Sequence, residues 1–589
     1  VLVAIVRKRG SNMFRKAFST TEKLENFNKP LIGMRTGDNE RFLRFWYEPS
    51  LNALSMYKYD SAKWFPYCKG GEFRRWYGNQ EVVVYWANDG YSIKFETLKK
   101  YPNLSWDNLG WKISNEKYYF HESITWTCVC SSLFSARFVP HGQIFDTGGS
   151  FIPLIIGSDK DQLLGYLNSR VSQSFLSVIN PTINYGNGSV AKLPWKFLET
   201  NFHSIQFLIH ISKQDWDSFE TSWGFQQLPL LGVRGEGLGV RECYTKMREQ
   251  WIENTLKMQE LEEENNRIFI EAYGLQDELS PDVPLNEITL TCNPYYRYQV
   301  SGDRCQEADV REFPINEDLE KRLLADTMKE LISYAAGCMF GRYSLDKPGL
   351  ILAIQGEGLD DYIVKVLGVG GLGVSGLGVR DSGSGEAALK PNTQNLKPSF
   401  MPDKDNVIPI LDGEWFIDDI VSRFTDFLKV AYGTEKYSEN ISFIEEALGK
   451  DLRTYFMKDF YNDHVKRYKK RPIYWLFSSP KGSFNALIYM HRYTPDTVSI
   501  LLNGYLREYI HKLRAKVTQL EHQLGSGSLS EREKMLTRKE IERLKDIISE
   551  LEAWESKVIL PLAEKRLEID LDDGVKVNYG KFGEALKRC

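Results

Sequence analysis

The sequence predicts a multidomain α+β protein, and three observations point to this class. Residues 1 to about 200 alternate short aromatic and β-branched runs with Gly, Asn and Pro turns, which is typical of strands. Residues 201–280 and 501–560 instead carry apolar side chains at helical spacing. A chain of 589 residues is also too long for one ordinary core, so about two to four domains are expected.

The first part of the chain contains several strand candidates and one long helix candidate. Apolar residues recur every three or four positions across 163–178, which predicts a single helix that stops at Asn180-Pro181. The strands are expected at residues 81–86, 124–130, 134–139 and 151–156. We therefore expect this part to be β-rich.

Two glycine-rich stretches interrupt the helical middle of the chain. Residues 231–241 and 367–380 share the unit Leu-Gly-Val and contain no aromatic side chain. Glycine loses much conformational freedom on folding and adds no side chain to a core. Both stretches are therefore predicted to be surface inserts that bury little, and their deletion is expected to leave folding nearly intact.

The C-terminal part is predicted to contain an antiparallel helical hairpin at 501–560. The string GSGS at 525–528 separates two runs whose apolar residues alternate spacings of three and four. Such spacing is typical of the seam between paired helices. The expected seam residues are Leu506, Ile510, Leu513, Val517, Leu520 and Leu524 in the first helix, and Ile541, Leu544, Ile548, Leu551 and Val558 in the second.

Composition narrows the classes of protein to consider. The net charge of −4 gives no overall positive field, so any DNA contact must come from a local basic patch. Eight cysteines in so long a chain favour reduced thiols and a cytoplasmic location, and the isolated pair Cys128 and Cys130 makes no zinc site. No apolar run is long enough to span a membrane. The first residues, VLVAIVRKRG, do not form a signal peptide, and we expect them to be one strand of something longer.

The stretch from residue 31 to residue 86 combines cations with aromatic residues. It contains TGDNERFLRFW and KWFPYCKGGEFRRWYGNQEVVVYW, with glycine turns at Gly33 and at Gly70-Gly71. Cations beside aromatic faces can bind phosphates and stack on bases. The same composition also suits an aromatic β core with Arg and Lys on its rim. The residues alone leave both interpretations open.

These two strings resemble the region after the catalytic domain in the adenine-specific DNA methyltransferases of BREX phage-resistance systems, the PglX family. The resemblance recurs in CMFGRYSLDKPG, VIPILDGEWFIDDIV, KRPIYWLFSSPKGSFNALIYMHRY and LDDGVKVNYGKFG, so it spans nearly the whole chain. The strings are similar, more loosely, to the target-recognition regions of restriction enzymes that carry a methyltransferase in the same chain. The resemblance implies contact with double-stranded DNA, and S-adenosylmethionine as cofactor of the full-length enzyme.

The sequence lacks the two motifs that such a methyltransferase needs. These are a glycine-rich loop after a strand, and an Asn-Pro-Pro-aromatic loop that holds a flipped adenine. The string NPYY at 293–296 lacks the second proline and is interpreted as a turn that closes a strand at 288–292. Glu414, Asp418 and Asp419 are interpreted as solvent-facing helix caps. We therefore expect no catalytic residue, no metal and no tightly bound S-adenosylmethionine in this chain, and no DNA methylation by the purified chain.

The candidate DNA contacts fall into two groups. The turn at 35–39 offers a fork donor, a hydroxyl and an amide, which suits contact with base edges. Cations beside the turn at 70–71, and the run at 466–471 before a hairpin of aromatic strands, suit contact with phosphates. A solvated helix end is the alternative for that run. The candidate residues are Arg35, Thr36, Asn39, Arg41, Arg44, Lys69, Arg74, Arg75, Lys466, Arg467, Lys469, Lys470, Arg471 and Lys481.

The sequence thus predicts the DNA-recognition and complex-docking portion of an adenine-specific DNA methyltransferase, with double-stranded DNA and other phage-defence proteins as partners and no membrane contact. One alternative is an interaction scaffold that uses the hairpin without reading DNA, and another is a restriction-type nuclease subunit. Four parts are expected: a remnant of a catalytic-domain edge or a linker at 1–30, a target-recognition domain at 31–200, a helical middle at 201–405 and a C-terminal module at 406–589.

Overall fold

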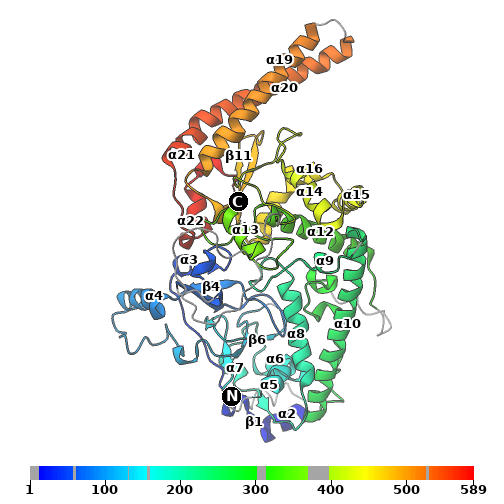
Figure 1. Cartoon of the computed structure of the whole chain (residues 1–589). Helices are drawn as coiled ribbons and strands as arrows, with labels where there is room; N and C mark the ends of the chain where they lie inside the picture. The colour runs from blue at the N-terminus through cyan, green and yellow to red at the C-terminus, as the bar shows by residue number, and fades with distance from the viewer. Residues whose placement is uncertain are drawn as a thin grey trace, which may run out of the picture. The chain divides into compact units, whose positions relative to one another are not determined.

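The computed structural model of the chain describes residues 12–57, 61–130, 132–155, 159–235, 237–300, 313–368, 397–525 and 529–588 (Figure 1). The chain divides into two compact units. Unit 1 comprises Val1–Pro229 and Glu242–Leu324, and unit 2 comprises Leu230–Arg241 and Ala325–Cys589. Each unit contains helices and small sheets, which confirms the α+β class. The finer division into four parts stays a prediction. Within the described ranges, no helix combines the length and apolar character that crossing a bilayer requires.

The strands of unit 1 are short and lie in small sheets. They are β1 (Glu22–Lys23), β2 (Leu43–Phe45), β3 (Trp64–Cys68), β4 (Val82–Tyr85), β5 (Ser123–Trp126), β6 (Ala136–Val139), β7 (Ile144–Phe145), β8 (Phe151–Pro153) and β9 (Pro194–Trp195). The largest sheet has the order β2-β4-β3-β7, antiparallel except for the parallel pair of β3 and β7. A second sheet has the order β6-β5-β8, and β1 pairs with β9. All pairs in the second and third sheets are antiparallel.

The strands expected from the sequence are present in shortened form, as β4, β5, β6 and β8. The single helix expected at 163–178 is wrong, because the chain forms two helices there, α5 (Lys160–Asn168) and α6 (Arg170–Ile179). Ser169 lies between them in extended backbone, at φ −74° and ψ 156°. Its hydroxyl accepts a hydrogen bond from the amide of Ser172 at 3.2 Å. This serine caps the second helix and therefore ends the first.

Aromatic side chains dominate the core of unit 1. The rings of Phe145 and Phe151 stack with centroids 4.0 Å apart, and Tyr166 packs against Trp195 and Phe269. The β-core interpretation therefore holds for much of the aromatic stretch at 31–86, since Phe42, Trp46, Tyr47, Trp64, Tyr67, Trp76, Tyr77 and Trp86 are all buried. The other helices that contribute to this unit are α2 (Asn12–Thr20), α3 (Asn39–Phe42), α4 (Ala87–Lys100), α7 (Asn187–Val190), α8 (His203–Asp217), α10 (Val240–Tyr273), α11 (Pro294–Arg297) and α12 (Glu317–Met339).

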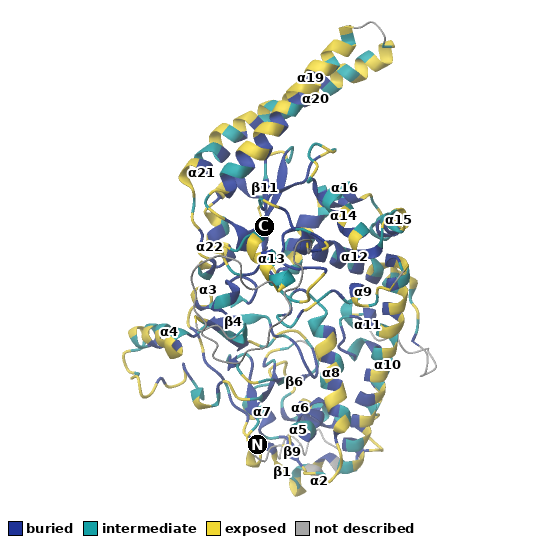
Figure 2. Cartoon of the chain, in the orientation of Figure 1, coloured by how far each residue is buried: buried dark blue, intermediate teal, exposed yellow. Residues whose placement is uncertain are grey.

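Unit 2 is built around a three-stranded antiparallel sheet with buried strands (Figure 2). Its strands are β10 (Ile408–Pro409), β11 (Tyr474–Ser478) and β12 (Asn485–Tyr489), in the order β10-β12-β11. Tyr474 lies opposite Tyr489, and Ser478 lies opposite Asn485. The surrounding α-helices are α9 (Pro229–Gly232), α13 (Leu359–Leu367), α14 (Ile420–Tyr432), α15 (Tyr437–Leu448), α16 (Leu452–Tyr455), α17 (Tyr461–Arg467), α18 (Thr497–Ile500), α19 (Arg507–Gly525), α20 (Glu531–Trp554), α21 (Leu560–Lys565) and α22 (Val575–Gly580).

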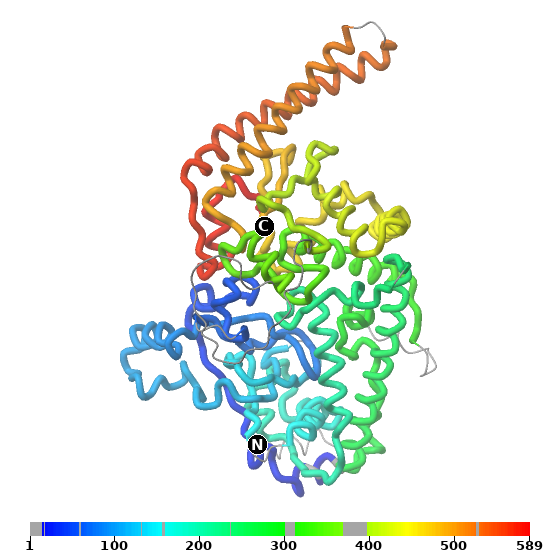
Figure 3. Tube along the Cα trace, viewed as in Figure 1, coloured from blue at the N-terminus to red at the C-terminus, as the bar shows by residue number. Residues whose placement is uncertain are grey.

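Helices α19 and α20 run side by side as the expected hairpin of unit 2 (Figure 3). Four of the expected seam residues near its base, Leu513, Val517, Leu544 and Leu551, are buried. Arg514 pairs with Glu552 at 2.5 Å, and Lys545 pairs with Glu521 at 2.8 Å, which is an antiparallel pairing. Ile548, which lies between Leu544 and Leu551, is half-buried, and so are Leu520 and Leu524 toward the tip. The seam is therefore tight at its base and more open at its end.

The glycine-rich stretch at 231–241 is only in part the weakly buried surface insert that the sequence predicts, since the described residues between 232 and 238 are exposed or half-buried. Leu231 and Val240 are both buried, and Leu231 belongs to helix α9. The backbone amide of Val240 donates to Oδ1 of Asn440 on α15 at 2.8 Å. The segment therefore packs within unit 2 through its few apolar side chains. In the second stretch, at 367–380, residues from 369 onward lie outside the described part of the chain.

Replacing Leu231 by alanine is expected to lower the free energy of unfolding by about 2–5 kcal/mol, because it removes buried methyl groups and leaves a cavity. Thermal and urea unfolding of the purified chain measure this effect. Leu536→Ala is the matched control, because Leu536 is 54% exposed. Equal stability of the two variants would mean that the stretch at 231–241 is a weakly buried surface insert after all.

Candidate nucleic-acid interface

Arg74 and Arg75 are interior residues of unit 1. The exposed fraction of Arg75 is 2%, and its guanidinium pairs with Glu262 at 2.6 Å and with Glu287 at 2.8 Å. Burial alone would lower the pKa of Arg75. Its two carboxylate partners raise that pKa by more than burial lowers it, so the net shift is upward. Arg74 pairs with Asp215 at 3.2 Å. Both guanidinium groups are buried and paired with carboxylates inside the fold, so the structure does not support the prediction that these two residues bind phosphates.

The turn at 35–39 contains a buried polar pair and an exposed cation. The hydroxyl of Thr36 donates to Oδ1 of Asn39 at 2.5 Å, and Thr36 itself is buried. Asp38 caps α3 by accepting from the amide of Arg41 at 3.1 Å. Arg35 is exposed, and its guanidinium lies 4.9 Å from the ring centroid of Trp111. Among the expected base readers, Arg35 and Asn39 thus face solvent, while Thr36 holds the turn.

The remaining candidates of unit 1 lie in or next to strands of the largest sheet, Arg41 in α3 before β2, Arg44 in β2 and Lys69 just after β3. Arg41 is exposed and pairs with Glu96 on α4 at 3.1 Å. Arg44 is half-buried, donates to the carbonyl of Glu40 at 2.6 Å and lies over the ring of Trp64. Lys69 is exposed beside Gly70, whose φ of 89° requires glycine. Arg41 and Lys69 therefore keep the exposure that a phosphate contact needs.

The loop after α4 brings Trp111 and Lys112 to Arg35. Trp111 is 50% exposed. The Lys112 ammonium lies 4.3 Å from the Trp111 ring centroid and 4.6 Å from that of Tyr101. A hydrogen bond from Lys112 lowers the pKa of Tyr101. Lys112 itself is only 7% exposed, so Arg35 is the exposed cation of this group. We call Arg35, Tyr101, Trp111 and Lys112 the cation–aromatic surface. Its last three members could not be predicted, because exposure cannot be read from aromatic content. The two tryptophans and the one lysine at 106–112 were the available signal.

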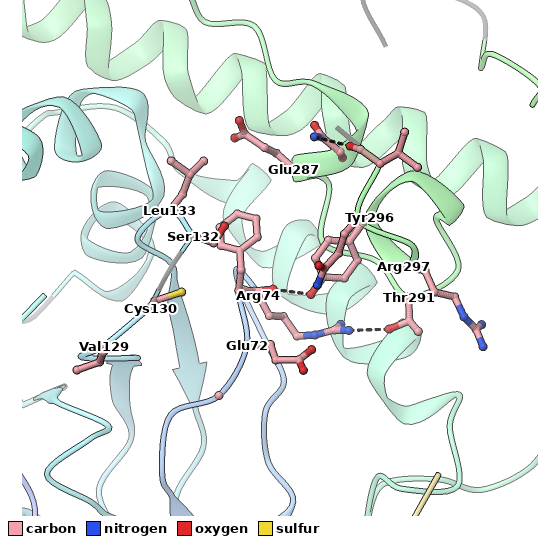
Figure 4. A pocket seen from close by; sticks show the side chains of 15 residues that line it. Glu72, Arg74, Val129, Cys130, Ser132, Leu133, Glu287, Thr291, Tyr296 and Arg297 are labelled. Carbon is pink, nitrogen blue, oxygen red and sulfur yellow. Dashed lines mark hydrogen bonds between the residues drawn. The ribbon is translucent and has the colours of Figure 1, made fainter. Parts of the chain in front are cut away.

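A cavity of about 900 Å³ lies beside Arg74 in unit 1 (Figure 4). Glu72, Cys130 and Glu287 are among the residues that line it. Its polar side chains are largely used within the fold, since Arg74 donates to Thr291 at 2.6 Å and the hydroxyl of Tyr296 donates to the carbonyl of Phe73 at 2.5 Å. No group of three or more His, Cys, Asp or Glu residues suited to a metal ion occurs in the described part of the chain.

Asn293 has a local structural role. It is fully buried, and its amide donates to the carbonyls of Leu285 at 2.7 Å and Ile288 at 3.0 Å. Its oxygen accepts from the amide of Tyr295 at 3.1 Å and so caps the short helix α11. These bonds support the structural interpretation of the NPYY string. The strand expected at 288–292 is wrong, because its last two amides bind the carboxylate of Asp215 instead of a neighbouring strand.

In unit 2, the basic run at 466–471 lies at the end of α17 and in the turn that follows. Lys466, Lys469 and Lys470 are exposed, and Arg467 and Arg471 are half-buried. Lys469 and Lys470 both adopt the left-handed backbone conformation, with φ of 49° and 61°, so the turn places two ammonium groups outward at a conformational cost. The run keeps the exposure that a phosphate contact requires.

The aromatic hairpin after this run is a core element and offers no surface to bases. Tyr474, Trp475 and Phe477 on β11 are fully buried. Lys481, in the turn between β11 and β12, is exposed, and its backbone amide donates to Glu550 of α20 at 2.7 Å. The predicted DNA-backbone contact in this part of unit 2 thus depends on the basic run and on Lys481, which stays on the surface, and not on the rings of the hairpin.

His464 fixes the turn that carries the basic run. Its Nε2 accepts hydrogen bonds from the amides of Ile473 and Tyr474 at 3.2 and 3.0 Å. Burial lowers the pKa of His464 well below its usual value of 6.5, and Arg467 and Arg342 lower it further. The folded protein therefore keeps this imidazole neutral, with Nε2 as an acceptor.

Stability is expected to fall as the pH drops below 6.5, because the unfolded state binds a proton at His464 that the folded state excludes. The slope from this residue is at most about 1.4 kcal/mol per pH unit. Urea unfolding between pH 7 and pH 5 measures it. His464→Gln should remove this contribution, whereas His511→Gln, at an exposed position, should not. Identical pH profiles for the parent and His464→Gln would contradict a depressed pKa.

The acidic cluster at the start of α14 is only partly at the surface. Asp419 is buried, accepts from the amide of Val421 at 3.0 Å and binds the guanidinium of Arg453 through both oxygens at 3.0 Å. Burial raises its pKa, and Arg453 opposes that rise. The hydroxyl of Tyr505 donates to Asp418 at 2.8 Å. Asp419 is thus a helix cap, as expected, but it is not solvent-facing.

Two curated relatives match nearly the whole chain. The chain is 33% identical over 599 residues to the adenine-specific methyltransferase BrxX of Escherichia coli O9:H4 (strain HS). This alignment covers 97% of the chain and 44% of that relative. The chain is also 33% identical over 589 residues to the adenine-specific methyltransferase PglX of Lacticaseibacillus casei (strain Zhang). This alignment covers 95% of the chain and 42% of that relative. No protein-family model matches the chain. The resemblance seen in the sequence is thus confirmed, and the chain spans less than half the length of these relatives.

Proposed function

We propose that this chain is the DNA-recognition and complex-docking portion of an adenine-specific DNA methyltransferase of a BREX phage-defence system. The observation that carries the proposal is the 33% identity to two adenine-specific methyltransferases across 97% and 95% of the chain. Since the match covers 44% and 42% of those proteins, we assign methyl transfer to the part of the relatives that this chain does not match. The other defence proteins are its proposed partners.

S-adenosylmethionine is the cofactor that this proposal implies for the full-length enzyme. The residues of the described ranges do not fit it. In an α/β enzyme, a nucleotide-like cofactor binds at the carboxyl ends of parallel strands beside a glycine-rich loop. The described sheets have two to four short strands, and β3 with β7 is the one parallel pair among their named strands. Asn293, the nearest match to an adenine-binding asparagine, is buried and bonded within its own turn. No catalytic step is therefore assigned to this chain.

Two exposed basic regions support the DNA contact. In unit 1, the cation–aromatic surface places the exposed guanidinium of Arg35 against Trp111, whereas Lys112, at 7% exposure, is buried against the same ring. A cation–aromatic arrangement suits both phosphate and base contacts. In unit 2, the run at 466–471 presents three exposed lysines and no exposed aromatic ring, which suits phosphate contacts alone. Arg35 is thus the proposed base reader, and the run is the proposed sequence-independent grip.

Salt titration of duplex binding separates these two roles. Neutralising Lys469, Lys470 and Arg471 together should weaken binding to all duplexes alike. The slope of the logarithm of the binding constant against the logarithm of the salt concentration should also become shallower, by up to about 0.9 for each phosphate that the variant no longer neutralises. Arg35→Ala should instead narrow the affinity gap between a selected site and random duplex by about 1–3 kcal/mol.

The control for the triple variant makes the same charge change at the exposed residues Lys557, Lys565 and Lys576. An unchanged salt slope in the Lys469, Lys470 and Arg471 variant would remove the basic run from the interface. If Arg35→Ala lowered the affinity for the selected site and for random duplex by the same factor, Arg35 would be a phosphate contact and not a base reader.

An interaction scaffold that does not read DNA is the second candidate function. The observation in its favour is the hairpin of α19 and α20, whose outer face carries the half-exposed side chains Met535 and Leu536. Binding of a defence partner without any mobility shift of duplex DNA would favour this alternative.

A further inference from the structure

Three aromatic rings form an exposed stack on α4 and the loop that follows it. Tyr91 lies between Phe95 and Trp106, with ring centroids 6.0 and 5.4 Å away and interplanar angles of 15° and 19°. The exposed fractions of Tyr91, Phe95 and Trp106 are 53%, 48% and 51%. Exposed aromatic groups of this size are uncommon on a soluble surface without a binding role. We call these three residues the aromatic ladder.

The backbone holds the ladder in place before any ligand binds. Asn88, Asp89 and Gly90 all have positive φ, and a side chain at Gly90 would meet the Trp86 ring at 2.6 Å. This turn fixes where the right-handed part of α4 begins and places Tyr91 and Phe95 one turn apart on one face.

The loop that carries Trp106 is also closed by its own hydrogen bonds. Ser105 and Asn108 exchange two backbone bonds of 3.1 Å around Trp106. The Asn108 side chain accepts from the amide of Gly110 at 3.0 Å, and Asn115 donates to the carbonyl of Ile32 at 2.9 Å. A preformed platform of this kind loses little conformational freedom on binding.

A polar cavity of about 440 Å³ lies beside Trp106. Its volume is within the range of small-ligand sites. Asp107, Asn108, Ser114 and Asn115 line it together with apolar side chains, so it offers both acceptors and donors next to a flat aromatic face. Such a combination suits the edge of a nucleobase that stacks on the ring.

The charges around the ladder favour an anionic strand. Lys99 follows Phe95 by one helical turn and is exposed, and the Lys100 ammonium lies 6.0 Å from the ring centroid of Tyr101. Of the nearby acids, Glu96 pairs with Arg41, and Asp89 and Glu116 pair with Lys94. Asp107 lines the cavity and would repel a phosphate there, so the phosphates are expected on the lysine side of the ladder.

We propose that Tyr91, Phe95 and Trp106 are a stacking platform for unpaired nucleobases of a DNA strand, whose phosphates lie along Lys99 and Lys100. The inference rests on the proposed DNA contact and deepens it, because a paired base inside a duplex has no free face for a ring. Stacking on aromatic side chains tolerates any sequence, so the platform would hold locally opened DNA rather than read a site.

The test compares the full chain with its Trp106→Ala variant in binding a fluorescein-labelled mixed-sequence single strand and the matching duplex. Trp106→Ala should weaken single-strand binding roughly 5- to 150-fold, as expected for loss of one stacked base. Trp106→Phe should recover most of that loss. Phe197→Ala is the matched control, because Phe197 is 64% exposed and lies outside the ladder. An unchanged circular dichroism spectrum and an unchanged melting temperature show that each variant is folded.

The outcomes separate this inference from the proposed function. Duplex binding with single-strand affinity unaffected by Trp106→Ala would overturn the platform and leave the duplex contact in place. Single-strand binding that depends on Trp106, without duplex binding, would support the platform and contradict the duplex-reading role. Failure of the parent chain to bind either DNA would overturn both.

Discussion

Glu262→Ala is expected to lower the free energy of unfolding by about 3–5 kcal/mol. The carboxylate pairs with the buried guanidinium of Arg75 at 2.6 Å and accepts from the indole of Trp76 at 2.7 Å. Its removal leaves a cation with 2% exposure that only Glu287 still compensates, and an indole donor without its acceptor. Removing one partner of a buried ion pair is far more costly than replacing the pair as a whole.

Urea unfolding followed by circular dichroism measures this loss. Glu264→Ala on the same helix α10 is the matched control, since Glu264 is exposed, and it should change stability by less than about 0.5 kcal/mol. Similar midpoints for the two variants would mean that Arg75 reaches solvent, and would return it to the candidate DNA contacts.

Leu551→Asp is expected to destabilise the hairpin of unit 2 by about 3–4 kcal/mol. Leu551 is fully buried in the seam between α19 and α20, where a carboxylate would lose its hydration. Leu513→Asp should act in the same way from the facing helix. Hydrogen exchange of the amides in both helices measures the effect and separates it from global unfolding.

Ala515→Asp is the control for the hairpin, because Ala515 lies on the exposed face of α19. It should leave amide exchange in α20 unchanged. If Leu551→Asp also left the exchange of α19 unchanged, the two helices would not depend on each other, and the proposed docking role of a rigid hairpin would fail.

The hairpin and the strands of unit 1 could be predicted because their signals are local. The seam from Leu506 to Leu551 follows a three-and-four spacing that needs no knowledge of the rest of the chain. The two helices in place of the one expected at 163–178 depend on a single serine, Ser169, whose capping role competes with helix continuation. A periodic pattern of apolar residues does not reveal such a break.

The buried cations could not be predicted from their neighbours in sequence. Arg75 and Lys69 both lie among aromatic residues, yet only Arg75 has carboxylate partners, 187 and 212 residues away. The stretch at 231–241 was misread for the same reason, because Val240 is held by Asn440, 200 residues away. The composition of a segment does not say which residues elsewhere will cover it.

In the candidate DNA surface, residues of a type that is usually buried are exposed. Trp106 and Trp111 have the composition of core residues, but about half of each side chain is exposed. The sequence analysis placed the DNA contact at 31–86, whereas these two rings lie in the loop after α4. Arg35 links the two segments, since it is both a predicted contact and the cation over Trp111. The exposed rings thus lie beside one residue that the sequence predicts as a contact, and the position of the DNA contact itself stays a prediction.

Photocrosslinking is the most direct test of the claim that this chain contacts DNA. Duplex DNA carrying 5-iodouracil would be irradiated with the full chain, and the crosslinked peptides would be identified by mass spectrometry. We expect crosslinks in peptides that contain Arg35, Trp106 or Trp111, because aromatic side chains at the interface are the reactive partners. Crosslinks confined to other segments, or none at DNA concentrations that saturate binding, would contradict the proposed interface.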